Sequence, residues 1–261
     1  MAYLKSLIIF ILLLIYSFCY EKILLHFINN GTFNNLSNEY FNLADTIFYI
    51  PILIFFIFFY KNQPINKREI NYKRFINILL LVVLFKIIEN PITNIKFILE
   101  NENSLLTAGN SQKYGALYFV LSFINVVLLT SLVEELIFRK VIISFFDKKN
   151  ILYGCIFSSI LFATYHFNIS NIYSVKPLIS LLLGFLLSLI YTKLGLFYSI
   201  VFHSLYNLLW LVLNNNNLIY FKILNWLNFS YEYWVIIFCS LILFFYFLRR
   251  LDIGKITYLN K

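Results

Sequence analysis

The chain has 261 residues, of which 61% are hydrophobic and only 13% are charged, and its mean hydropathy is +0.79. This apolar share exceeds that of an ordinary soluble domain, so the composition excludes a water-soluble globular protein. The net charge is +9, but the basic residues stand at the ends of apolar runs and form no basic face, which argues against a nucleic-acid partner.

Apolar runs long enough to cross a bilayer recur along the chain, since a span needs roughly 20 such residues. They predict an all-α fold, a polytopic membrane helical bundle of about eight transmembrane helices, forming a single integral membrane domain over 1–261. The expected spans run near 4–20, 46–60, 75–90, 114–146, 151–166, 177–193, 195–213 and 231–248. Stretches rich in Asn and Ser are expected to be polar outer loops, at 29–45, 100–113 and 214–230.

The basic residues also predict an orientation, because Lys and Arg are enriched in cytoplasmic loops. With the N-terminus inside, most of the 21 basic residues become cytoplasmic. They fall at Lys5, in 61–74, in 139–149, at Lys193 and from 249 onward. An even number of spans then predicts that both termini are cytoplasmic.

Ionisable residues are costly inside apolar helices and point to function when they occur there. Three of the expected helices carry such residues with polar partners, namely Glu134, Glu135 and Arg139, then His166, then His203 and Asn207. Residues four apart share one helical face, as Glu135 and Arg139 do. At about 1.5 Å per residue from the cytoplasmic helix ends, the three groups reach nearly the same depth. They are therefore expected to meet inside the bundle.

In their order and spacing these residues resemble the motifs of type II CAAX prenyl endopeptidases and their bacterial relatives, the CAAX protease and bacteriocin-processing (CPBP or Abi) family. The motif EExxxR corresponds to Glu134, Glu135 and Arg139, FxxxH to Phe162 and His166, and HxxxN to His203 and Asn207. The resemblance spans about 134–207 and implies a catalytic core over about 114–213. It also implies an enclosed, conical cavity that opens to the cytoplasm or the inner leaflet.

Peptide hydrolysis needs an activated water, donors for the oxyanion and exclusion of bulk water. Glu134 is expected to be the general base, and His166 is expected to help hold the water. The resemblance implies that His203 and Asn207 donate hydrogen bonds to the oxyanion.

Supporting roles and cofactors follow from the same residues. Glu135 is expected to pair with Arg139. Phe162 is assigned to the site only because it lies four residues before His166. No cofactor is expected, although Glu134 with the two histidines leaves zinc open, without the HExxH motif that would set its geometry. Near the outer end of the third run, Lys86 and Glu89 are expected to form a local ion pair rather than a site.

The chain is therefore predicted to be an intramembrane endopeptidase that uses a glutamate-activated water near the cytoplasmic side. Its partners would be the bilayer and a peptide or membrane-anchored protein, in CAAX-type, bacteriocin or peptide-signal processing or in self-immunity. The composition, rich in Asn, Ile and Phe, favours an AT-rich genome and a bacterial cell membrane.

Two alternatives are weighed against the enzyme, and the oligomeric state is not predicted. One is a proton-coupled transporter in which Glu134, His166 and His203 form a relay, but no inverted repeat or pair of broken helices supports it. The other is a catalytically inactive immunity or scaffold protein of the same fold.

Overall fold

The computed structural model describes residues 1–27, 46–54, 56, 71–95, 98, 115–167, 175–215 and 217–251. Within these ranges the chain is helical apart from short turns and contains no strand, which confirms the all-α prediction. The main helices are α1 (Ala2–Phe27), α3 (Tyr72–Ile88), α4 (Asn90–Thr93), α8 (Ile151–Tyr165), α9 (Lys176–Leu194), α10 (Leu196–Asn215), α11 (Asn217–Leu227) and α12 (Tyr231–Arg250).

One long helix between α4 and α8 is assembled from α and π turns. Its parts are α6 (Ala116–Ser122), the π-helix η3 (Phe123–Thr130), α7 (Ser131–Glu134), the π-helix η4 (Glu135–Ile142) and the 3-10 turn η5 (Ile143–Phe145). A π turn closes i→i+5 hydrogen bonds and so rotates the side chains that follow it. Glu134 ends α7 and Glu135 begins η4, which places the paired carboxylates at such a change. The span predicted at 114–146 is confirmed, whereas its π segments were not predicted.

Six of the described helical segments are long and apolar enough to cross a membrane. They are Ala2–Tyr20, Tyr72–Thr93, Ala116–Phe145, Lys176–Leu194, Leu196–Asn215 and Tyr231–Arg250. The predicted span at 151–166 forms as α8, but its 15 residues reach only about 22 Å, short of the roughly 30 Å hydrocarbon core. Of the span predicted at 46–60, only 46–54 and 56 belong to the described residues, where they are helical.

The loop predictions need one correction. The stretch 214–230 contains α11, because apolar residues follow the run of asparagines and pack against α12, where Leu224 is buried with Tyr233. An apolar face that finds a partner outweighs the local polarity of the asparagines. The predicted loops at 29–45 and 100–113 lie wholly outside the described residues.

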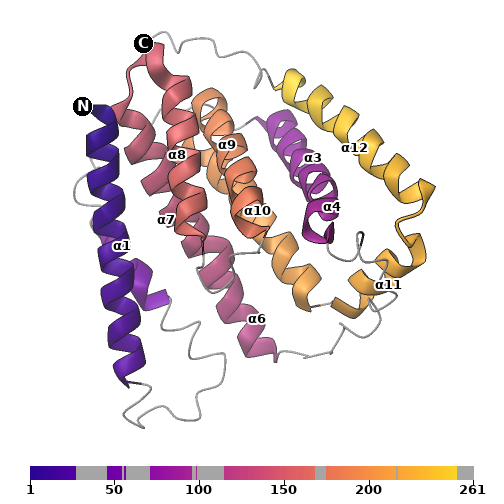
Figure 1. Ribbon diagram of the computed structural model, residues 1–261, viewed down its shortest axis with the longest axis horizontal. Helices are drawn as coiled ribbons and strands as arrows, with labels where there is room; N and C mark the ends of the chain where they lie inside the picture. The colour runs from indigo at the N-terminus through magenta and orange to yellow at the C-terminus, as the bar shows by residue number, and fades with distance from the viewer. Residues whose placement is uncertain are drawn as a thin grey trace.

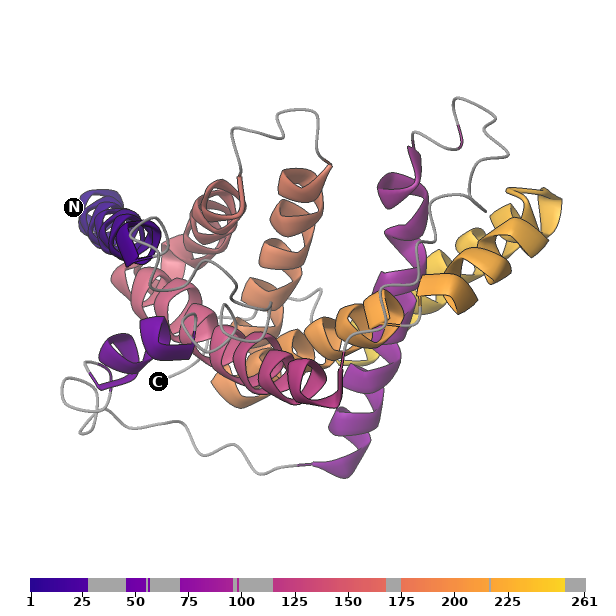
Figure 2. The same ribbon diagram turned by 90° about the horizontal axis from the view of Figure 1, so that it is seen from below.

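Helix α10 is the centre of the bundle, where it packs against α9, α3, η3, α7 and η4. Figure 1 shows α1 at one edge of the molecule and α12 at the other, beside α3. Seen from below in Figure 2, α3 stands apart from α8 and α9, which pack closely against each other. Gly184 permits that close packing, since a Cβ there would lie 3.1 Å from Phe162 Cδ1 and 3.3 Å from the Ser159 Cα.

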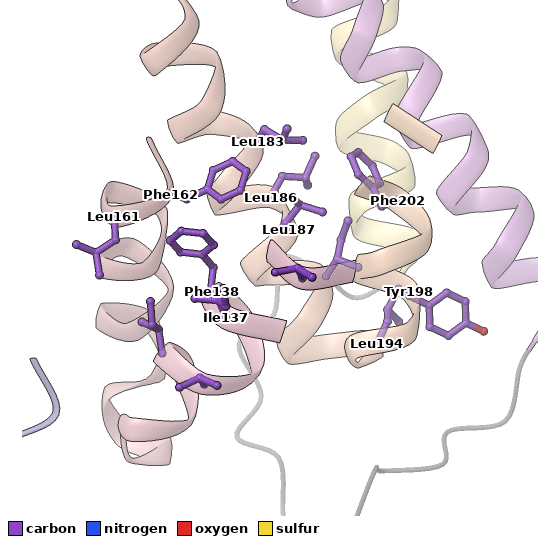
Figure 3. Close-up of a cluster of buried hydrophobic side chains, with 14 of the residues drawn as sticks. Ile137, Phe138, Leu161, Phe162, Leu183, Leu186, Leu187, Leu194, Tyr198 and Phe202 are labelled. Atoms are coloured by element: carbon purple, nitrogen blue, oxygen red, sulfur yellow. The ribbon is translucent and has the colours of Figure 1, made fainter. Parts of the chain in front are cut away.

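The main apolar core joins η4, α8, α9 and α10. Figure 3 shows Phe138, Phe162, Leu187 and Phe202 gathered from these four helices, and all four are buried. The rings of Phe138 and Phe162 meet edge to face with centroids 5.2 Å apart. This core fixes the helices that carry the polar motif residues.

The N-terminus and the C-terminal end of α12 lie at the same end of the bundle, which we call the terminal end (Figure 1). The ring of Tyr3 packs there against Phe146, at a centroid distance of 4.9 Å. Helix α3 begins at this end and runs toward α4 (Figure 1). The Asn71 N–H donates to the Tyr198 hydroxyl at 2.9 Å, so α10 begins beside the start of α3. We call the opposite end the far end. Assignment of the terminal end to the cytoplasm stays a prediction.

Candidate active site

The paired carboxylates have opposite surroundings, although both are buried. Glu135 is fully buried and is held by three groups. Arg139 Nε lies 3.3 Å from its Oε2, His203 Nδ1 lies 3.1 Å from its Oε1, and the Ser199 hydroxyl donates to Oε2. Since each oxygen has a charged or donating partner, the cost of burying this carboxylate is compensated.

Arg139 is also fully buried and extends this network to α8. Its Nη1 donates to Ser158 Oγ at 3.0 Å, and the Ser158 hydroxyl donates to the Phe138 carbonyl at 2.6 Å. The guanidinium lies 4.9 Å from the centre of the Phe162 ring, which is within the range of a cation–π contact. Phe162 thus contributes a ring surface to the site as well as a place in the core.

Glu134 faces two imidazoles without forming a direct hydrogen bond to either. His166 Nε2 lies 3.6 Å from Oε1, and His203 Nε2 lies 3.7 Å from Oε2. Both distances exceed the usual hydrogen-bond range but allow electrostatic contact. The side chain is 4% exposed, and within the described part of the chain its Oε2 has no hydrogen-bond partner. A buried carboxylate oxygen without a partner is costly and calls for a functional reason.

In each imidazole the contact made by Nδ1 leaves Nε2 as the nitrogen that faces Glu134. His203 Nδ1 is directed at the carboxylate of Glu135, and His166 Nδ1 is 2.9 Å from the carbonyl oxygen of Phe162. A carbonyl and a carboxylate oxygen can only accept a hydrogen bond, so we assign the donated proton of each ring to Nδ1. The other ring nitrogen, Nε2, faces Glu134 in both histidines. His166 also stacks at 4.5 Å on the Phe162 ring, which restricts its orientation.

Asn207 lies one turn beyond His203, but its amide hydrogens are directed at the long helix. Its Nδ2 donates to the Val126 carbonyl at 3.0 Å and to Ser131 Oγ at 3.0 Å. The contacts fasten α10 to η3 and α7, beside Glu134. The oxyanion role implied for Asn207 by the resemblance stays a prediction, because in this arrangement both donors are already used.

The two imidazoles border a pocket of about 500 Å³. Its lining residues include Phe162, His166, Lys176, Ser180, His203, Tyr206, Asn207 and Trp210, and also Lys86 and Glu89. Lys86 and Glu89 form the expected ion pair, and the Tyr206 hydroxyl donates to Glu89 Oε2 at 2.7 Å. Their place in the pocket was not predicted. Enclosure of this pocket, expected from the resemblance, stays a prediction.

Sequence reasoning also missed the serines that hold the charged residues. Ser199 precedes His203 by four residues, as His203 precedes Asn207, so one face of α10 carries all three. That spacing was a usable signal for Ser199. Ser158 belongs to another helix, and its contact with Arg139 could be found only from the fold.

The same side chains bear on the question of a metal. Among the described residues, no three His, Cys, Asp or Glu side chains form a group arranged to hold a metal ion. The zinc alternative that the sequence leaves open for Glu134 and the two histidines stays a prediction.

Comparison with known families gives one match, to the family described as type II CAAX prenyl endopeptidase Rce1-like, over residues 116–209. The matched segment begins with α6 and ends within α10, so it includes Glu134, His166 and His203. Comparison with curated proteins and with solved structures found no significant match. The match confirms the predicted resemblance to type II CAAX prenyl endopeptidases over this central segment of the chain.

Proposed function

We propose that the protein is an intramembrane endopeptidase that cleaves a peptide or a membrane-anchored protein with a water activated by Glu134. The observation that carries the proposal is the buried Glu134 carboxylate between two imidazole Nε2 atoms, beside a pocket. Within the described residues Oε2 accepts no hydrogen bond, so it has lone pairs available for a water proton.

In the first step Glu134 takes a proton from the attacking water. His166 helps to hold that water, because its Nδ1 is committed to the Phe162 carbonyl and its Nε2 is left as an acceptor. The water oxygen then attacks the substrate carbonyl carbon and forms a tetrahedral oxyanion. The oxyanion collapses, the peptide C–N bond breaks, and the proton on Glu134 passes to the leaving amine nitrogen. General-base catalysis of this kind contributes about 10²- to 10⁴-fold to the rate.

His203 acts on the oxyanion that forms in this attack. Its Nε2 faces Glu134 and, when it carries a proton, donates to the developing negative charge. Glu135 is a positioning residue, because it binds Nδ1 of the same ring while Nε2 faces Glu134. Arg139 balances the charge of Glu135 from the other side. Asn207 keeps α10 and its histidine in register with α7.

We place the protein in a bacterial cell membrane with both termini in the cytoplasm, where it serves peptide processing or self-immunity. The charge pattern of the sequence supports the orientation. The chemistry described above uses protein groups and water, so we expect no need for a metal cofactor.

The test is cleavage of candidate peptides encoded beside this gene, read by mass spectrometry with detergent-purified protein. Glu134→Gln keeps the shape of the side chain but cannot accept the proton, so we expect cleavage to fall about 10²- to 10⁴-fold. Its thermal unfolding should stay close to that of the wild type, because Oε2 gives up no hydrogen bond. Glu232→Gln, on the exposed start of α12, is the matched control and should cleave normally.

The other outcomes separate the competing functions. Loss of cleavage after chelation, reversed by zinc, would overturn the metal-free mechanism. Function in cells that survives Glu134→Gln, with no product from any peptide, would identify an inactive scaffold or immunity protein. Proton-coupled flux that depends on Glu134, again without a peptide product, would identify a transporter.

A further inference from the structure

The pocket residues lie in the middle of the helices that supply them or toward the far end. Helices α3 and α10 begin at the terminal end, where Asn71 and Tyr198 meet, and α9 ends there because it directly precedes α10. The α3 side supplies Lys86 and Glu89, from the end of the helix and just beyond it. Helix α9 supplies Lys176 and Ser180, both from its first turns.

The catalytic side chains follow the same direction. His166 caps the C-terminal end of α8, a helix that starts at the terminal end and stops short of a full span. Helix α10 lines the pocket from His203 to Trp210, which is its middle and later part. From Glu134, the pocket of the described structure therefore extends toward the far end.

Packed side chains close the opposite direction. Between the carboxylate pair and the terminal end lie Phe138 and Ile142 of η4, Leu187 and Ile190 of α9, and Phe202 of α10, each with 0% exposure. They belong to one continuous core, in which Figure 3 labels Phe138, Leu187 and Phe202. A core at ordinary packing density leaves no passage for a peptide, so the terminal end offers no route through these helices.

The charges at the two ends indicate which side of the membrane each one faces. Described basic residues at the terminal end are Lys5, Lys73, Arg74, Lys140, Lys148, Lys149, Lys193, Arg249 and Arg250, whereas the far end has Lys22, Lys86, Lys176 and Lys222. At the far end, the charge of Lys86 is balanced by Glu89. An excess of Lys and Arg marks the cytoplasmic side, so the terminal end faces the cytoplasm and the far end faces outward.

From these observations we infer that substrates enter the site from the extracytoplasmic side. The substrate class is an exported peptide, or the outer juxtamembrane segment of an anchored protein, rather than a tail presented from the cytoplasm. At the pocket, the Lys86–Glu89 pair and the Tyr206 hydroxyl supply polar contacts for an extended peptide backbone. This inference rests on the proposed peptidase site, and it differs from the cytoplasmic opening implied by the family resemblance.

The test is thiol labelling of the full chain in intact cells. The native cysteines Cys19, Cys155 and Cys239 are replaced by Ala in a background that retains cleavage. Single cysteines are then introduced by Ser180→Cys, in the pocket, and by Lys149→Cys, exposed at the terminal end. A charged, membrane-impermeant maleimide is added before or after permeabilisation.

We expect Ser180→Cys to be labelled in intact cells at least about tenfold more than Lys149→Cys, and both to be labelled after permeabilisation. We also expect labelled Ser180→Cys protein to lose cleavage. Labelling of Lys149→Cys but not Ser180→Cys in intact cells, equal labelling of both, or no labelling of Ser180→Cys even in detergent would each overturn the inference. The labelling does not depend on activity. It can therefore support outward access even if the cleavage test contradicts the peptidase, and the cleavage test can support the peptidase even if the labelling contradicts outward access.

Discussion

The closed and open sides of the carboxylate pair differ although their residues are adjacent on one helix. On the closed side, Glu135 meets Arg139, Ser199 and His203 Nδ1, and it is completely buried. On the open side, Glu134 faces the Nε2 atoms of two histidines at more than hydrogen-bond distance, near a pocket of about 500 Å³.

The difference teaches how a buried reactive carboxylate is accommodated. Burying a charge is costly unless another group compensates it, and Glu135 with Arg139 forms a compensated pair within one helical turn. That pair fixes His203 through Nδ1 and leaves Nε2 available at the open side. Substitutions on the closed side should therefore reduce stability, whereas Glu134 should be needed for chemistry alone.

The largest expected effect on stability follows from Arg139→Met. It leaves Glu135 buried without its countercharge, and breaking a buried pair in this way costs about 3–5 kcal/mol. We expect a much lower midpoint of thermal unfolding in detergent, with cleavage lost at the same time.

Two further variants sharpen that result. Arg249→Met removes a basic residue from the exposed end of α12 and should leave the midpoint unchanged. The double variant Glu135→Gln/Arg139→Met removes both charges and should be more stable than Arg139→Met alone. If the double variant is no more stable, the cost comes from lost packing on Phe162 and the electrostatic account of the closed side is wrong.

A smaller effect is expected where the two sides meet, at His203. His203→Phe removes the partner of Glu135 Oε1, and a buried acceptor left without a donor costs about 1–3 kcal/mol. His166→Phe removes the hydrogen bond to the Phe162 carbonyl and the electrostatic contact with Glu134. Because the His166 side chain is 34% exposed, stability should change little. Both variants should lose cleavage. Equal loss of stability in the two variants would contradict the division between closed and open sides.

Much of the helical fold could be predicted, because long apolar runs in the sequence indicate membrane-spanning helices. The long helix at 114–146 was located by its hydropathy, but its π segments were not, since they depend on hydrogen bonds that hydropathy does not report. Helix α8 forms over the predicted 151–166, but its 15 residues are fewer than a full span needs. The helix within 214–230 was missed because its asparagines concealed an apolar face that packs on α12.

The candidate site divides in the same way. Spacing of four residues brought Glu135 to Arg139, and the recurrence of charged residues on three helices indicated that they would meet. The open direction of the pocket could not be predicted, because Lys86 and Glu89 read in sequence only as a local ion pair. Their contribution depends on Tyr206 of a distant helix, which only the fold brings within 2.7 Å of Glu89.

The smallest expected effect is that of Ser158→Ala, which tests the outer layer of the closed side. The hydroxyl accepts from Arg139 Nη1 and donates to the Phe138 carbonyl, so the variant loses two hydrogen bonds. Arg139 still keeps Glu135 and the Phe162 ring, and for this reason we expect a loss of only about 1 kcal/mol, with cleavage reduced less than twofold. Thermal unfolding in detergent and the peptide assay measure the two quantities on one preparation. A large loss of cleavage with unchanged stability would mean that Ser158 acts on the chemistry, and that the closed side is not purely structural.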